Sequence, residues 1–349
     1  MVNMLITGLF IGAALGFVLQ RGRFCVTGAF RDVWVAKSSW WLGAVFMAIT
    51  VQAIGLAIFN SSGFLPTESV ASAFAPFATI AGGFIFGIGM LLAGGCATGT
   101  YYRASEGLVG SWFALIFYAL FAAIFKYGPL GETTSTVQSW GVTENATIYQ
   151  SLGISPWALV GVLTLTTGFW AYRNLTRPKL PVASLPAEKT GLAHLLFEKG
   201  WNPYLTGVLV GVIALAAWPL SWATGREWGL GITTPSANLT SYLATGDTTF
   251  VDWGFFLVLG ILLGSFIAAK ASGEFKIRVP SADILVKAIL GGVLMGWGAA
   301  WAGGCTIGNG LVETSMFSWQ GWVALVAMLA GAGLAAKLFI INRLSFIRS

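Results

Sequence analysis

The sequence predicts an all-α integral membrane protein with about nine transmembrane helices, short re-entrant helices and an inverted-repeat, pseudo-twofold architecture. Of its 349 residues, 56% are hydrophobic and only 9% are charged, whereas a soluble domain has about 25% charged residues. Its apolar segments are long enough for helices of roughly 20 residues and lack the short alternating pattern of barrel strands. In addition, one glycine-rich segment occurs twice in the chain.

Nine apolar segments are expected to span the bilayer, and the first begins near the N-terminus. This first segment has no Lys or Arg before its apolar run and no small-residue cleavage site, so we interpret it as a span and not as a signal peptide. The expected spans are about 4–19, 40–59, 75–95, 108–125, 155–172, 204–220, 253–270, 284–304 and 321–341.

The loops between these spans sort by charge. Of 19 Lys and Arg residues, only Lys126 and Arg226 fall on one side, and the others occupy the alternate loops and the C-terminal tail. The positive-inside rule therefore predicts an N-terminus outside and a C-terminus in the cytoplasm. Because the positive charges lie in loops, the net charge of +6 indicates membrane topology and attraction of anions. No nucleic-acid partner is expected. The loop 173–200, which contains His194, is expected to be a linker.

The repeated segment reads GGFIFGIGMLLAGGC at 82–96 and GGVLMGWGAAWAGGC at 291–305. Five spans separate the two copies, so they are expected to run in opposite directions, as in the inverted repeats of transporters. This divides the chain into a first repeat at 1–128, a connector span and linker at 129–200, and a second repeat at 201–349.

Each copy of the segment ends in a glycine pair followed by small polar residues. Gly94 and Gly95 in the first copy, and Gly303 and Gly304 in the second, are expected to break their helices. The chain beyond each break is expected to form a short re-entrant helix whose positive end faces an anion. An ordinary glycine cap leading into a loop is the alternative.

Three cysteines lie at the most unusual points of the chain. Cys96 and Cys305 end the two copies, and Cys25 lies in a segment at 20–37 that is too apolar for a loop and too charged for a span. With one histidine and no CxxC, neither a metal site nor a cofactor is expected. Thiols are soft, polarizable groups that suit a sulfur-bearing substrate, although a packing role or a redox pair remains open.

Five charged residues lie close to these cysteines in sequence. Arg21, Arg23 and Arg103 are candidates to attract an anion, or they reflect only the cytoplasmic excess of positive charge. Glu106 and Glu313 are unusual so near the glycine breaks, and each is a candidate proton carrier or salt-bridge partner.

The motif QRGRFCVTGAFRD, together with the doubled AGGC, resembles the YeeE/YedE family of bacterial inner-membrane sulfur-compound transporters. The resemblance covers nearly the whole chain. It implies an hourglass-shaped helical protein that takes up thiosulfate, with Cys25, Cys96 and Cys305 passing the ion inward through transient S–H···S hydrogen bonds. It also implies a small TusA-like sulfur-carrier protein as cytoplasmic partner, and it leaves selenium compounds open as substrates.

Other functions compete with this prediction. A membrane thiol oxidoreductase or sulfurtransferase would use Cys25 and Cys96 as a reactive pair, but it would not need an inverted repeat. A transporter of another small anion, or a subunit that does not itself transport, is also conceivable. We predict a transporter of a small sulfur-containing anion, which is not an enzyme.

Overall fold

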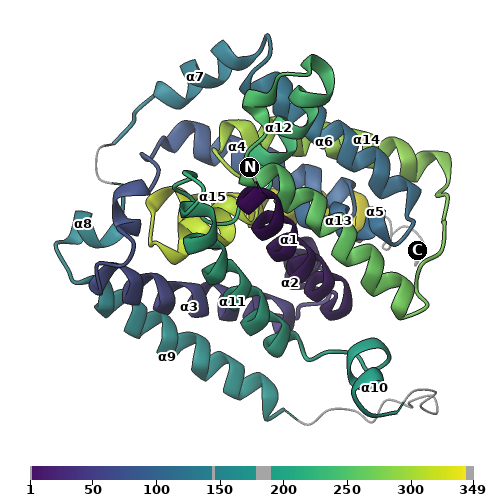
Figure 1. Ribbon diagram of the computed structural model, residues 1–349, viewed down its shortest axis with the longest axis horizontal. Coiled ribbons are helices and arrows are strands. Elements are labelled where there is room, and N and C mark those ends of the chain that lie inside the picture. The colour runs from purple at the N-terminus through teal and green to yellow at the C-terminus, as the bar shows by residue number, and fades with distance from the viewer. Residues whose placement is uncertain (1, 144–145, 178–189, 343–349) are drawn as a thin grey trace.

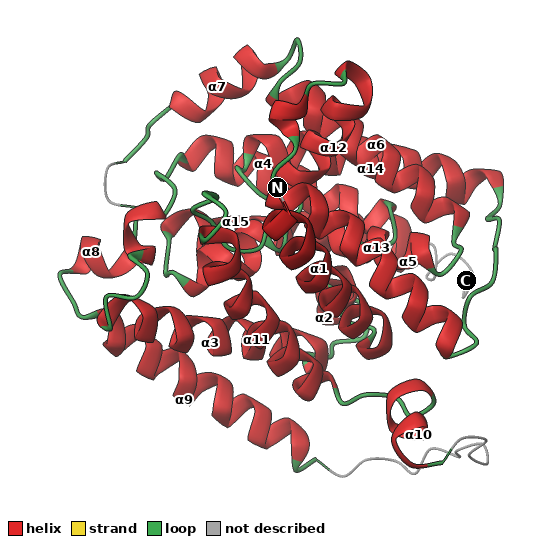
Figure 2. Cartoon of the chain, in the orientation of Figure 1, coloured by secondary structure: helices red, strands yellow, loops and turns green. Residues whose placement is uncertain are grey.

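The computed structural model describes residues 2–143, 146–177 and 190–342, apart from the side chains of residues 68 and 69. In Figure 2 these residues form helices joined by loops, without a β-strand, which confirms the all-α class. The elements are α1 (Val2–Gly22), α2 (Val26–Trp34), α3 (Trp40–Ser61), η1 (Thr67–Val70), α4 (Pro76–Leu92), α5 (Ala97–Ser105), α6 (Val109–Lys126), α7 (Gly131–Ser139), α8 (Ile148–Leu152), α9 (Pro156–Leu175), α10 (Gly191–Phe197), α11 (Pro203–Trp222), α12 (Thr233–Thr245), η2 (Thr248–Phe250), α13 (Trp253–Ala271), α14 (Ala282–Trp301), η3 (Gly308–Glu313), α15 (Trp319–Ala336) and η4 (Lys337–Ile341).

Long helices occupy all nine expected spans. Eight helices of the described chain are long and apolar enough to cross a membrane. Helix α9 has 20 residues but is not among the eight, because threonines and a polar C-terminal turn lower its hydropathy. It runs along the outer edge of the molecule beside α3 in Figure 1, with Leu165 and Phe169 exposed. A ninth crossing therefore stays a prediction.

The long helices pack in reciprocal pairs. Helix α1 packs on α13 and α3 packs on α11, while α4 packs on α15 and α14 packs on α6. Helices α4 and α14, which contain most of the repeated segment, pack on each other. Exchanging the two halves of the chain converts each pair into its counterpart. This is the pairing that an inverted repeat would produce; the repeat and its boundaries stay predictions.

Glycines of the repeated segment allow these helices to approach closely. A Cβ at Gly82 would lie 2.6 Å from the carbonyl oxygen of Gly298, and one at Gly89 would lie 2.8 Å from that of Gly291. A Cβ at Gly87 would lie 2.2 Å from the carbonyl oxygen of Met328 on α15. These positions therefore serve helix packing in the manner of small-residue interfaces in membranes.

Short helices complete the interior. Helices α2 and α5 and the π-helical segment η3 follow the three cysteines, and the described residues of α5 are mostly buried. The predicted linker is described only in part, since residues 178–189 lie outside the described ranges. His194 lies in α10 beside it and contacts Glu198 at 2.7 Å.

Candidate functional site

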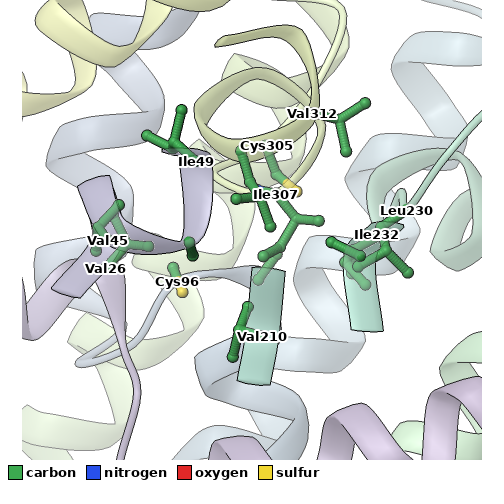
Figure 3. Packing of buried hydrophobic residues seen from close by; sticks show 14 of the residues in the cluster. Val26, Val45, Ile49, Cys96, Val210, Leu230, Ile232, Cys305, Ile307 and Val312 are labelled. Carbon is green, nitrogen blue, oxygen red and sulfur yellow. Dashed lines mark hydrogen bonds between the residues drawn. The ribbon is translucent and has the colours of Figure 1, made fainter. Parts of the chain in front are cut away.

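The three cysteines begin short helical segments inside the protein. Cys25 is the residue before α2, Cys96 is the residue before α5, and Cys305 precedes η3 by three positions. Their exposed fractions are 5%, 0% and 0%, and none forms a disulfide. Figure 3 shows Cys96 and Cys305 in one packed region with Val26 of α2 and Ile307.

The two glycine pairs turn the chain into this region by the same backbone geometry. Helix α4 ends at Leu92 and α14 ends at Trp301. Two residues later, Gly94 has φ of 70° and Gly303 has φ of 74°, the left-handed conformation that favours glycine. Each turn is thus a glycine cap, as the simpler alternative proposed, but it leads into a buried helical segment and not into a surface loop.

The first turn places Cys96 against Cys25. A Cβ at Gly99 would lie 3.0 Å from Sγ of Cys25 and 3.4 Å from Sγ of Cys96, so both sulfurs face this glycine. The two thiols interact directly, and the hydroxyl of Thr306 lies against the Cys96 thiol without forming a well-aligned hydrogen bond. Cys25 and Thr306, the residue after Cys305, therefore both meet Cys96, although all three positions are far apart in sequence.

Cys305 connects this cluster to the second half of the chain. The backbone N–H of Ile307 donates to its Sγ at 3.4 Å. The side chain of Tyr118 contacts Cys305, and its hydroxyl donates to Oγ1 of Thr233 at 3.0 Å. Thr233 begins α12, which occupies the place of α2 in the second half but has no cysteine.

A C-x-x-G pattern occurs at all three cysteines and was not among the predicted site features. The stretches CVTG, CATG and CTIG place Gly28, Gly99 and Gly308 three residues after each cysteine. A Cβ at Gly28 or Gly308 would meet no atom within 4 Å, whereas Gly99 faces two sulfurs. The glycines thus keep space beside the thiols, and the spacing itself was the signal that could have identified them.

Helix N-termini also converge here. Helices α2, α5 and α12, of 9, 9 and 13 residues, begin at or beside this cluster. The first N–H groups of a helix lack intrahelical partners and have a partial positive charge. The region therefore combines soft thiols with an electrostatic preference for anions.

The face on which α1 and α5 end is called the basic face and includes Arg23, Arg103 and Arg278. There Arg23 forms ion pairs with Glu106 and, at 2.7 Å, with Glu274. Arg21 also contacts Glu274 at 3.3 Å. Arg21, Arg23 and Glu106 are thus joined in one ion-paired cluster.

Arg103 has different surroundings. Its Nη1 would lie 3.6 Å from a Cβ at Gly95, and its Nε donates to the Tyr102 hydroxyl at 3.3 Å. Among the described residues it forms no ion pair with a carboxylate. It lines a cavity of about 260 Å³ together with Gly94 and Arg278. The first turn therefore has beside it a guanidinium group that faces a cavity and is not paired with a carboxylate of the described chain.

The opposite face, which includes Lys126 and Arg226, contains a cavity at the second turn. This cavity has a volume of about 420 Å³ and is lined by Gly303, Gly304, Asn309, Glu313, Arg226 and Asp252, among others. The side-chain amide of Asn309 donates to the carbonyl oxygens of Ala302 at 2.8 Å and Gly304 at 3.1 Å. Glu313 is 1% exposed.

Comparisons with known proteins identify a family and relatives of this chain. A family model described as sulphur transport matches residues 21–334. The thiosulfate transporter TsuA of Escherichia coli (strain K12) is 50% identical over 342 residues, covering 98% of this chain and 96% of the relative. The thiosulfate transporter TsuA of Spirochaeta thermophila is 32% identical over 94% of this chain and 97% of the relative. A probable transporter YedE of Salmonella typhimurium is 36% identical over 33% of this chain and 28% of the relative.

Proposed function

Because this chain belongs to the sulphur-transport family of membrane transporters, we propose that it takes up thiosulfate through a path lined by Cys25, Cys96 and Cys305. The observation that supports this most directly is the contact of Cys25 with Cys96, beside Thr306, at the start of α2 and α5. Two relatives that align over nearly their whole length are thiosulfate transporters by name.

The site matches both parts of the ion. Thiosulfate has a terminal sulfur and three oxygens, and it has two negative charges. The N-termini of α2, α5 and α12 offer N–H groups to the oxygens. The hydroxyl of Thr27, two residues after Cys25, is buried, has no hydrogen-bond partner among the described residues and is free to donate as well. The three thiols contact the terminal sulfur, which sulfate lacks, and this difference gives selectivity.

Two cavities lie on opposite sides of the cysteines. The cavity on the opposite face reaches the second glycine turn, and the cavity on the basic face reaches the first. With the basic face toward the cytoplasm, the ion enters near Gly303, passes the closed centre from thiol to thiol, and leaves beside Arg103. A TusA-like carrier would receive it there.

The membrane potential opposes this direction. Moving one elementary charge costs about 2.3 kcal/mol per 100 mV, so inward movement of a dianion costs about 4.6 kcal/mol at 100 mV, inside negative. Helix N-termini lower the barrier but do not supply this free energy. Uptake therefore requires either consumption of thiosulfate inside or a coupled ion.

Uptake of radiolabelled thiosulfate into proteoliposomes that contain only this protein tests the proposal. Wild type would be compared with Cys25→Ala, Cys96→Ala and Cys305→Ala, with excess sulfate as competitor. We expect uptake that sulfate does not block and that each substitution reduces at least tenfold. If all three variants took up thiosulfate at the wild-type rate, the path lined by thiols would be ruled out.

The direct contact between Cys25 and Cys96 also favours a second candidate, thiol redox or sulfur-transfer chemistry. In that reaction a thiolate would take the outer sulfur of thiosulfate and release sulfite, which leaves a persulfide. Attack of the second thiolate on this persulfide would release sulfide and leave a disulfide. Mass spectrometry of alkylated protein distinguishes the two: unmodified thiols after many transport cycles support the hydrogen-bonded path.

A further inference from the structure

Glu313 is a buried carboxyl group that the proposed path does not use. It ends η3 and borders the cavity on the opposite face. Its Oε1 accepts a long hydrogen bond of 3.4 Å from the backbone N–H of Ser72. The Ser318 hydroxyl lies close to the carboxyl group, but Oε2 accepts no well-aligned hydrogen bond from the described residues. Helix α15 packs directly on it, since a Cβ at Gly321 would lie 2.6 Å from Cβ of Glu313. The carboxyl group is thus enclosed on one side and next to the cavity on the other.

No cation neutralises this group in the described part of the chain. The α3 and α15 helices, which pack against η3, contain no titratable side chain. Across the cavity, Arg226 is paired with Asp252 at 3.4 Å. Lys126 lines a neighbouring cavity and donates to Thr234. Burial without a counterion favours the neutral acid, and it raises the pKa of Glu313.

Glu106, on the basic face, makes the contrast clear. It is also buried, at 4% exposed, but it forms an ion pair with Arg23 and accepts from Gln20 at 3.1 Å. Arg23 is thus the counterion of this carboxylate, and Gln20 is a further hydrogen-bond donor to it. Of the two acidic residues singled out in the sequence, Glu106 therefore has a structural role.

We propose that Glu313 is the proton-carrying group of this transporter and that a proton moves inward with the anion, an inference that rests on the proposed thiosulfate uptake. An ionised Glu313 would repel a dianion in the adjoining cavity, and a protonated one would not. Binding of the anion and of the proton therefore favour each other, and this coupling is reciprocal. The proton offsets part of the charge that the membrane potential opposes.

Thiosulfate accumulation in proteoliposomes under an imposed pH gradient tests this coupling. The potential is held at zero with valinomycin and equal potassium on both sides. For one proton per anion, we expect about tenfold accumulation for each pH unit when the outside is acidic. Glu313→Gln mimics the protonated acid, so it should keep thiosulfate exchange but lose this accumulation. Glu132→Gln, which removes an exposed carboxylate from α7, is the matched control and should behave as wild type.

Three outcomes would overturn the inference while leaving thiosulfate transport intact. Accumulation in wild type could be independent of the pH gradient, it could persist in Glu313→Gln, or it could follow a sodium gradient instead. A wild type that takes up no thiosulfate would contradict the proposed function. Infrared spectroscopy of the purified protein then decides the role of Glu313 separately. A protonated-carboxyl band that thiosulfate perturbs, and that Glu313→Gln alone removes, supports the inference, and its absence refutes it.

Discussion

The two glycine turns share a sequence and a backbone conformation but differ in the side chains beside them. At the first turn, the guanidinium of Arg103 lies beside Gly94 and Gly95, and a regular α-helix follows Cys96. At the second turn, the amide of Asn309 binds the carbonyl groups of the turn, and a π-helical segment follows. Each turn therefore repeats the backbone geometry with side chains of different charge.

This difference distinguishes two roles of the residues at the turns: the lining of the proposed path and the electrostatics of each face. The glycine pair and the cysteine that line the proposed path are the same in both copies of the repeated segment. The side chains beyond them set the electrostatics of each face: cationic groups and an ion-paired carboxylate on the basic face, and amides with an unpaired carboxyl group on the opposite face. An anion on the proposed path would thus meet two different electrostatic surroundings.

The largest expected effect compares Gly303→Ala with Gly94→Ala. Both substitutions place a side chain at positive φ, which costs about 1–2 kcal/mol. At Gly303 the new Cβ would also lie 2.7 Å from Nε2 of Gln320, whereas at Gly94 the nearest atom is 3.9 Å away. We expect Gly303→Ala to lose about 2–4 kcal/mol in total and to show the lower Tm in detergent. An equal Tm for the two variants would contradict this difference.

The next comparison separates support of the backbone from binding of the anion. Asn309→Ala leaves two buried carbonyl groups unpaired, at about 1–3 kcal/mol, so its Tm should fall. Arg103→Ala removes a cation from a cavity wall, so its Tm should change less and its thiosulfate uptake should fall more. Thermal unfolding and uptake measured on both variants check this crossed pattern. A larger uptake defect in Asn309→Ala, at equal amounts of folded protein, would contradict it.

A smaller effect is expected for alanine substitutions at the glycines three residues after Cys96 and Cys305. Gly99→Ala would place a Cβ 3.0 Å from Sγ of Cys25, whereas Gly308→Ala, at the equivalent position, meets no atom within 4 Å. We expect about a tenfold loss of uptake, equivalent to about 1.4 kcal/mol, for Gly99→Ala alone. Initial rates in proteoliposomes would measure this. Equal rates for both alanine variants would mean that the sulfurs are not on the path.

The smallest effect concerns the ion-paired cluster. Glu106→Gln breaks the ion pair with Arg23, whose side chain is 47% exposed, so solvent limits the loss to about 1 kcal/mol or less. The Tm difference from wild type should shrink as salt is raised. The response of accumulation to a pH gradient should not change, unlike that of Glu313→Gln. If the Glu106→Gln variant no longer responded to the pH gradient, the proton carrier would be Glu106 on the basic face, and the assignment to Glu313 would be wrong.

Much of the architecture followed from local properties of the sequence. Long apolar segments predicted the helices, because a chain in lipid must satisfy its backbone within the helix. The glycine pairs predicted where helices end, because a left-handed turn strongly favours glycine. Their attached cysteines were therefore expected at the junctions, where the structure places them. The ninth crossing does not follow in this way, because α9 is long but only moderately apolar.

The tertiary structure alone decided which of these residues meet. Nothing local brings Cys25 to Cys96, or Tyr118 to Cys305 and Thr233, because these contacts depend on how distant helices pack. The same holds for the two acids: Glu106 and Glu313 look alike in sequence, but within the described ranges only Glu106 forms an ion pair with an arginine. Burial and the presence of a counterion are properties of the assembled fold, and they determine the charge of a carboxyl group.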